Sequence, residues 1–309
     1  MAQLIKLRDY ISRYEWNMYR YPSQFIRLKQ ENWKKLNQAW EEQSDLSVAK
    51  EESVPDKDML FTKLKSLLKR SSNLSVEDGQ NRPPRLLPAK REDLKHYFLD
   101  KLYPSQLNWA TSTVSDISFI AQKYYRDTQL KYFLQRFPDT YLLLYYPIFS
   151  IKNTPVDGEI ILISPLGMEI IYLFADGAAE NIIAEEGRTW TLHDKGDTIS
   201  VLNPFIALRR TEKIIKSIIH QKEIDFPVQK TVLAPDTPIY FQKEPYQSRI
   251  IGSRQYPDWF GDKRALVSPL KNRQLRAAEA VLNYCETNAV KRPEWEEDDL
   301  DQFPLSDEV

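Results

Sequence analysis

The chain has 309 residues, 42% of them hydrophobic, and its 43 Lys and Arg residues almost balance its 44 Asp and Glu residues, for a formal net charge of −1. Such a chain is long enough for about two domains with a sizeable core, and its near-neutral charge excludes a global attraction to nucleic acid. The single cysteine, Cys285, excludes an internal disulfide and a cysteine-based zinc cluster.

The sequence pattern contains no membrane or secretion signal. Met1 is followed by no signal-peptide core, and the longest apolar run, 142–151, is far shorter than the roughly 20 residues that span a bilayer. We therefore expect a cytoplasmic protein with no membrane span. Among the eight glycines, Gly79 alone lies within the first 157 residues. Because tight turns between strands favour glycine, this bias predicts a helical first half.

Apolar residues spaced three and four apart predict a helical arm over residues 1–43. The spacing is typical of a coiled-coil seam. Pro22 interrupts it, so we expect two helices, at about 3–20 and 22–43. The seam favours core packing or contact with a partner helix, including a homodimer, over the stacking of bases. The residues expected at such a partner contact are Leu7, Ile11, Tyr14 and Met18.

Residues 44–91 are expected to form a basic linker that contains one short helix at about 56–70. Between Lys57 and Arg91 there are nine basic and three acidic residues, a local net charge of +6. Such a segment can bind phosphates by counterion release, and it is equally typical of a solvated linker. At the other end of the chain, residues 290–309 form a strongly acidic tail that we expect to be disordered.

The middle of the chain, residues 92–270, has the pattern of an α/β core. Two apolar runs, 160–163 and 170–174, flank a Pro-Leu-Gly turn, and this pattern predicts a hairpin of buried strands. Glu169 and the acidic residues that follow the second run are assigned to the turn and to a solvated loop, because Asp and Glu are usually exposed.

Helix signals surround the last third of this core. Asn203-Pro204 is typical of a helix start, because Asn can cap free amides and proline suits the first turn. We expect a helix from there to about Gln221. Residues 255–262 are expected to form an aromatic loop, and the helical spacing of apolar residues predicts a C-terminal helix within 271–289.

The order and spacing of these features resemble the nuclease-related domain, NERD, a branch of the restriction-endonuclease-like fold. The resemblance covers about residues 112–240. It rests on a helix ending near Phe137, a strand over 141–151, Gly158-Glu159-Ile160, the Gly167 turn, Trp190, Asn203-Pro204 and a last strand near Val232. It implies an α/β fold whose core is a restriction-endonuclease-like mixed sheet with helices, preceded by the N-terminal helical arm.

The catalytic positions that the resemblance implies are replaced in this chain. The chemistry of that fold requires two carboxylates to hold Mg²⁺ and a lysine to orient the attacking water. Glu159 alone survives among the acidic positions; if strand alternation holds, it shares a face with Ile161 and can act as a ligand, although a lone charge at a strand end is the commoner interpretation. The replaced positions are Ile161, Tyr172, Phe174 and Ala207.

The predicted helix after Asn203 carries a second basic surface opposite a stripe of isoleucines. In the resembled fold the corresponding helix lies near the substrate groove, so the resemblance implies contact with a nucleic-acid backbone. A plain solvent-facing helix side accounts for the cations equally well. The candidate nucleic-acid-binding residues are Arg209, Arg210, Lys213 and Lys216.

These observations predict a non-catalytic, nuclease-related scaffold that binds nucleic acid or protein, with DNA or a DNA-maintenance protein as partner. We expect no cofactor and no metal site, since His96, His193 and His220 are too scattered to form one. One alternative is a metal-dependent nuclease, using Mg²⁺ or Mn²⁺, whose displaced site is built around Glu159. Another is a pure protein-interaction module that contacts no nucleic acid.

Overall fold

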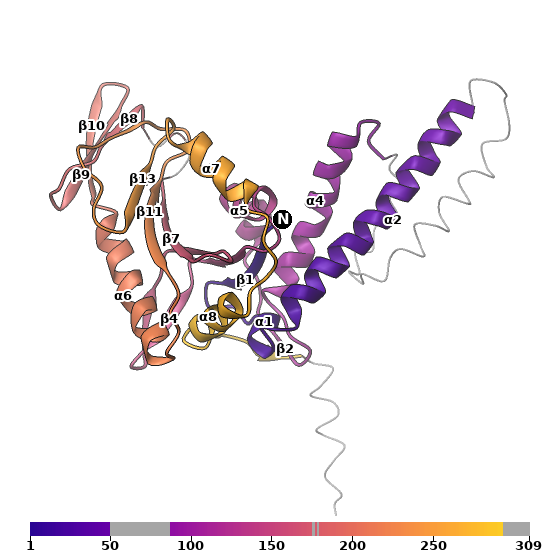
Figure 1. Cartoon of the computed structure of the whole chain (residues 1–309), viewed down its shortest axis with the longest axis horizontal. Helices are drawn as coiled ribbons and strands as arrows, with labels where there is room; N and C mark the ends of the chain where they lie inside the picture. The colour runs from indigo at the N-terminus through magenta and orange to yellow at the C-terminus, as the bar shows by residue number, and fades with distance from the viewer. Residues whose placement is uncertain (50–86, 175–176, 178, 293–309) are drawn as a thin grey trace, which may run out of the picture. The chain divides into compact units, whose positions relative to one another are not determined.

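The computed structural model describes residues 1–49, 87–174, 177 and 179–292 (Figure 1). They divide into two compact units: a larger one, made of residues 1–23 and the described residues from 103 onwards, and a smaller one within 24–102. Most of the predicted basic linker, including its short helix, and most of the acidic tail lie outside the described residues. The sheets and helices confirm the predicted α/β class.

A six-stranded mixed sheet forms the centre of the larger unit. In spatial order its strands are β1 (Gln3–Leu7), β3 (Leu142–Tyr145), β6 (Ile160–Ile163), β7 (Met168–Leu173), β11 (Val228–Leu233) and β13 (Ser248–Ile251). β6 is antiparallel to both of its neighbours, whereas the other adjacent strands pair in parallel. β1, β3 and β6 are buried along their whole length, as expected of strands covered on both faces.

Helices cover both faces of this sheet (Figure 1). α6 (Phe205–Gln221) packs on β7 and β11 from one side, with α8 (Asn272–Leu282) beside it. α5 (Thr128–Arg136) and α7 (Tyr256–Ala265) lie on the other side, where the ring of Phe137 contacts both Phe133 and Trp259. The strands therefore present one row of side chains to α6 and the alternate row to α7.

Shorter strands form smaller sheets around this core. A four-stranded sheet has the order β10 (Asp197–Leu202), β9 (Thr189–Asp194), β8 (Asn181–Ile183) and β12 (Ile239–Tyr240). Two-stranded pairs are β4 (Ile148–Ile151) with β5 (Thr154–Asp157) and β2 (Asp116–Ile117) with β14 (Val290–Lys291). A 3-10 helix, η1 (Gln122–Arg126), precedes α5.

The predicted helix at about 3–20 is wrong, because the chain begins with β1 and then forms the single turn of α1 (Arg13–Trp16). The side chain of Gln106 fixes β1 by accepting from the Leu4 amide at 2.9 Å and donating to the Ala2 carbonyl at 2.6 Å. Pairing with β3 and burial on both faces outweigh the local helical spacing of the apolar residues.

Several other expectations are confirmed. The second predicted helix is α2 (Tyr21–Ala49), which has Pro22 in its first turn. The predicted hairpin is β6 and β7, where Ser164 Oγ accepts from the Gly167 amide at 3.2 Å. The predicted helix start holds as well, since Asn203 Oδ1 accepts from the first amide of α6 at 3.0 Å.

Three boundaries differ from expectation. The predicted aromatic loop at 255–262 is wrong, since these residues belong largely to α7, which begins with a proline in its first turn. The C-terminal helix, α8, ends at Leu282, earlier than expected. The predicted strand over 141–151 is split into β3 and β4, because Tyr146 adopts a left-handed φ of 48° and Pro147 follows it.

The smaller unit contains most of α2 and the first part of α4 (Arg91–Trp109). The rings of Trp33 and Phe98 lie 5.2 Å apart between these helices. The indole N–H of Trp40 donates to the Pro88 carbonyl at 2.7 Å. Among the described helices, none is long and apolar enough to cross a membrane.

Candidate functional site

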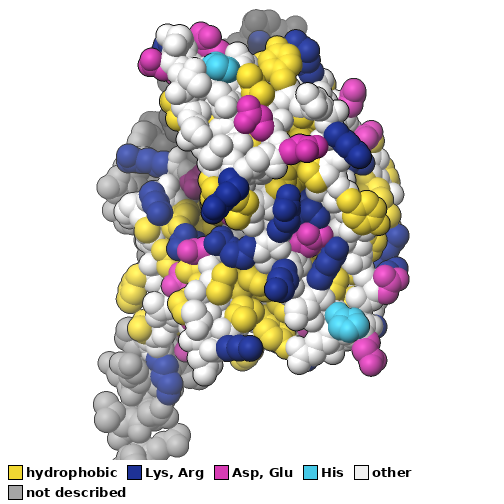
Figure 2. All heavy atoms as spheres, turned by 90° about the vertical axis from the view of Figure 1, so that its left-hand side faces the viewer, with side chains coloured by type: hydrophobic (Ala, Val, Ile, Leu, Met, Phe, Trp, Pro, Cys, Tyr) yellow, Lys and Arg dark blue, Asp and Glu magenta, His cyan; other side chains and the backbone are white. Residues whose placement is uncertain are grey.

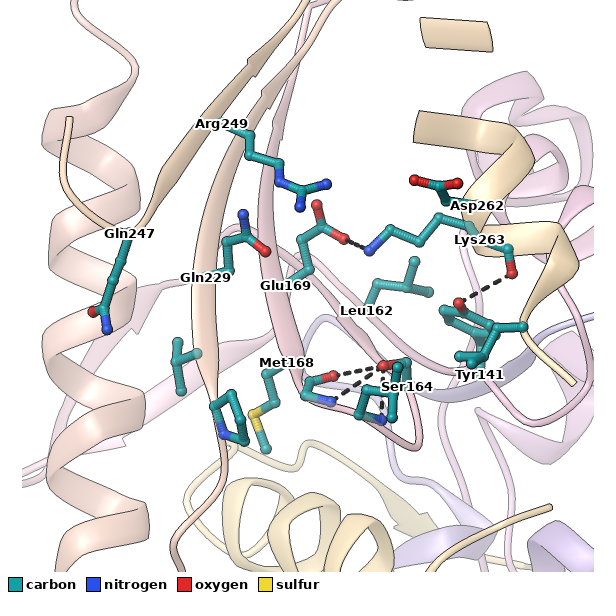
Figure 3. Close-up of a pocket in the computed structure, with 15 residues that line it drawn as sticks. Tyr141, Leu162, Ser164, Met168, Glu169, Gln229, Gln247, Arg249, Asp262 and Lys263 are labelled. Carbon is teal, nitrogen blue, oxygen red and sulfur yellow. Dashed lines mark hydrogen bonds and ion pairs between the residues drawn. The ribbon is translucent and has the colours of Figure 1, made fainter. Parts of the chain in front are cut away.

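A pocket of about 490 Å³ opens beneath α7, at the edge of the six-stranded sheet where β7, β11 and β13 begin (Figure 3). Because these strands are parallel, their first residues meet at one edge. Glu169 pairs with Gln229 in the strand register, and Arg249 pairs with Thr231. Gln229 and Thr231 are two residues apart in β11, so their side chains lie on the same face of the sheet. Their paired residues, Glu169 and Arg249, therefore lie on that face too, which α7 covers.

Glu169 forms the polar floor of this pocket and is only 4% exposed. One carboxylate oxygen accepts from Thr231 Oγ1 at 2.5 Å and from the Trp259 indole N–H at 3.0 Å. The other oxygen pairs with the ammonium of Lys263, which lies on α7. A buried carboxylate requires this kind of compensation. The same contacts fix α7, and hence Lys263, over the strand ends.

Three further polar side chains line the pocket and are not held by the protein. Arg249 and Asp262 are exposed, Gln229 is half-buried, and among the described residues none of the three has a side-chain hydrogen bond or ion pair. Figure 3 shows the Arg249 guanidinium directed over the pocket, on the same side as Glu169. These groups are therefore available to a ligand: a guanidinium and an amide can donate to phosphate oxygens, and a carboxylate can accept a proton.

Glu159 lies on the opposite side of the sheet, directly before β6. Its amide donates to Thr211 Oγ1 of α6 at 3.2 Å. Burial raises the pKa of the Glu159 carboxyl, the positive charge of Arg210 opposes the shift, and Asp157 adds to it. Burial, together with the negative charge of Glu159, also raises the pKa of Tyr146. Among the described residues, no three His, Cys, Asp or Glu side chains form a group that can hold a metal.

Apolar packing occupies the positions where the resemblance would place catalytic groups. Ile161 is fully buried in β6. Tyr172 is half-buried in β7, and its ring centroid lies 5.3 Å from that of Phe174, which in turn stacks on Trp190. Ala207 lies half-buried in the first turn of α6. Ile161, Tyr172 and Ala207 therefore contribute packing and no charge on this side of the sheet.

The structure does bring the four predicted cations together on α6. Figure 2 views the face to which α6 belongs and shows Lys and Arg side chains gathered across its middle. Arg209, Arg210 and Lys213 are exposed, while Lys216 pairs with Glu212 at 2.9 Å and donates to Gln247 at 3.2 Å.

The residues predicted at a partner contact lie elsewhere than expected. Leu7, Tyr14 and Met18 are at most 1% exposed and pack in the core of the larger unit, and Ile11 is half-buried. They are not arranged as one helical seam, because Leu7 lies in β1 and Tyr14 in α1. The structure thus buries Leu7, Tyr14 and Met18 in the core, where they present no surface to a partner helix.

The sequence pattern does not identify the pocket residues. It predicts a solvated turn at Glu169, yet Glu169 is the second residue of β7 and is buried. The signal in the sequence is a charged residue within the apolar run 168–171, because a charge in a buried strand needs a buried partner. Arg249 and Lys263 carried no comparable pattern, because they reach the pocket from separate elements that meet there through strand pairing and the docking of α7.

Comparison with known proteins gives one informative likeness. No protein-family model matches the chain, and no solved structure matches it. The chain is 36% identical over 113 residues to an RNA 2',3'-cyclic phosphodiesterase of Geobacillus stearothermophilus. The match covers 34% of this chain and 36% of that protein, so the chain spans about a third of this relative's length.

This likeness corrects the predicted function. The sequence predicts a non-catalytic, nuclease-related scaffold, with a pure protein-interaction module as an alternative, but the relative is a phosphodiesterase, which is an enzyme. Ile161, Tyr172 and Phe174 occupy positions that matter only to the site implied by the resemblance, and they leave a site elsewhere open. The findings do not bear on the resemblance to the nuclease-related domain, which stays a prediction.

Proposed function

We propose that the chain is a phosphodiesterase that hydrolyses RNA ends carrying a 2',3'-cyclic phosphate, and that it holds this phosphate in the pocket beneath α7. The observation that carries the proposal is the 36% identity with an RNA 2',3'-cyclic phosphodiesterase. Because the match spans about a third of each chain, both the activity and the substrate are part of the proposal.

The pocket has the size and the donors that a terminal nucleotide phosphate needs. Its volume of about 490 Å³ lies within the range of roughly 300 to 1,000 Å³ that is usual for small-ligand sites. Arg249 offers a planar fork of donors that matches phosphate oxygens, and Gln229 offers an amide. Lys263 adds a positive charge whose place is set by Glu169.

The proposed reaction adds water across one phosphorus–oxygen bond of the cyclic phosphate. A water oxygen bonds to phosphorus, the bond from phosphorus to the 2' or 3' oxygen breaks, and the proton released by the water is balanced by a proton gained by the departing oxygen. Arg249 and Lys263 stabilise the charge that develops on the phosphate oxygens. The carboxylate of Asp262 lines the pocket and makes no side-chain hydrogen bond or ion pair within the described residues. We assign to it the role of general base, which accepts the proton of the attacking water.

The finer fold and partner predictions belong to this proposal. The mixed sheet with helices on both faces is compatible with a restriction-endonuclease-like core, which stays a prediction. A DNA or DNA-maintenance partner likewise stays a prediction. The substrate proposed for the pocket is RNA, since the relative's name states RNA.

The test uses the purified full chain with cytidine 2',3'-cyclic phosphate and with an oligoribonucleotide that ends in a 2',3'-cyclic phosphate. Parallel reactions contain EDTA, Mg²⁺ or Mn²⁺, and the products are separated by chromatography. We expect both substrates to be opened to phosphomonoesters in at least one of these conditions. Absence of hydrolysis in all of them would overturn the proposed function.

A single substitution locates the activity. Arg249→Ala should lower kcat/KM by about 100-fold, which is the usual effect of removing one donor to a developing oxyanion. Arg188→Ala is the matched control, because Arg188 is an exposed arginine just before β9 in the four-stranded sheet. Equal activity of the two variants would show that the pocket is not the site of hydrolysis.

A further inference from the structure

The rim of the pocket continues around the sheet edge onto α6. Gln247 lines the pocket and accepts a hydrogen bond from Lys216 of α6 at 3.2 Å. Figure 3 shows Gln247 beside the α6 ribbon, at the far end of the pocket from Lys263. Gln247 directly precedes β13, which is an edge strand, and within the described residues no strand pairs with its outer side. The pocket and α6 therefore lie on the two sides of the edge strand β13.

Three cations of α6 form a stripe that leads away from this rim. Arg209, Lys213 and Lys216 are spaced four and three residues apart, so they lie on one side of the helix. At a rise of about 1.5 Å per residue the stripe is about 10 Å long. Arg210 is left out of this set because its charge acts on Glu159. We call Arg209, Lys213 and Lys216 the α6 stripe.

The one acidic residue of α6 does not cancel the α6 stripe. Glu212 accepts from the nearly buried Lys230 of β11 at 2.7 Å as well as from Lys216 at 2.9 Å. These two lysines hold the pKa of Glu212 below its usual range against the effect of its burial. Lys230 thus neutralises Glu212 from the core side. The charge of the exposed helix face is left positive, in keeping with Figure 2.

We infer that the α6 stripe binds the backbone of a single RNA strand whose 3' end enters the pocket, so that an oligonucleotide binds more tightly than a free cyclic nucleotide. This inference rests on the proposed function. The strand would leave the pocket past Gln247, cross the edge of β13 and follow the stripe from Lys216 to Arg209. Three cations along about 10 Å can contact consecutive phosphates. Such contacts depend on the charge of the phosphates and carry no sequence specificity.

Salt dependence gives the expected size of the effect. Each phosphate neutralised on a single strand contributes about −0.7 to the slope of log affinity against log salt. Three contacts therefore contribute a slope of about −2, which means about a 20-fold loss of affinity between roughly 50 and 200 mM salt. A variant without the α6 stripe should lose most of this dependence.

The experiment compares Arg209→Gln/Lys213→Gln/Lys216→Gln with Lys123→Gln/Arg126→Gln/Arg136→Gln, all in the full chain. The second variant removes the same charge from exposed residues of η1 and α5. Binding of a labelled oligoribonucleotide is followed by fluorescence anisotropy over a salt series. Hydrolysis of cytidine 2',3'-cyclic phosphate is measured for each protein.

We expect the α6 stripe variant to bind the oligonucleotide weakly and with a flatter salt slope, while it hydrolyses the small cyclic nucleotide as the parent chain does. The η1 and α5 variant should match the parent chain in both assays. A salt slope unchanged by loss of the α6 stripe would overturn the inference. Stripe-dependent binding by a chain that hydrolyses nothing would overturn the proposed function instead and leave the RNA path standing.

Discussion

Removal of Lys263 should destabilise the larger unit more than neutralisation of Glu169 does, although the two side chains form one ion pair. The side chain of Glu169 is 5% exposed and that of Lys263 is 20% exposed. Lys263→Met leaves a buried carboxylate with Thr231 and Trp259 as its remaining donors, at a cost of about 3 kcal/mol. Glu169→Gln keeps an acceptor oxygen for both donors, and Lys263 can extend to water, so its cost is about 1 to 2 kcal/mol.

Urea unfolding, followed by tryptophan fluorescence and circular dichroism, measures these costs from the shift of the midpoint. The double variant Glu169→Gln/Lys263→Met should cost less than the sum of the single variants, with a coupling of at least about 1 kcal/mol. Arg273→Met is the control, because it breaks an exposed ion pair with Asp225 and should give no resolvable shift. Equal losses in the two single variants, or additive losses in the double variant, would refute the reasoning.

Two further predictions concern titratable groups. The raised pKa of Glu159 makes the folded chain hold a proton to higher pH than the unfolded chain, so stability falls as pH rises from about 4.3 through the folded value. Glu159→Gln should therefore raise Tm relative to the parent chain at about pH 7 and not near pH 4; the same difference at both pH values would contradict this. Burial raises the pKa of Cys285 to about 12, so iodoacetamide at about pH 8 should label this thiol only after unfolding, and rapid labelling of the native chain would show otherwise.

Parts of the fold follow from short stretches of sequence. The hairpin of β6 and β7 is recognisable because two apolar runs flank a Pro-Leu-Gly turn, and α6 is recognisable from Asn203-Pro204 followed by an isoleucine stripe. In both cases the residues that specify the element are neighbours in the chain. The amphipathic pattern of α6 also placed its cations on the exposed side, where the structure has them.

Other parts depended on partners distant in the sequence. Residues 3–7 have a spacing compatible with a helix, yet they form a strand because β3, more than 130 residues away, offers backbone pairing and a buried position. The replaced positions that the resemblance implies likewise predict an inert protein, since local sequence cannot show that another set of polar groups gathers on the opposite face of the sheet.

What the sequence by itself determined is the α/β class, the central hairpin, the second N-terminal helix and the basic face of α6, because hydrophobic period, turn residues and caps act over a few residues. Tertiary structure alone decided that Glu169 is buried, that Lys263 and Arg249 line one pocket with it, and that Gln247 joins the pocket to α6. Those contacts arise from parallel strand register and helix docking. They bring together residues that carry no common pattern along the chain.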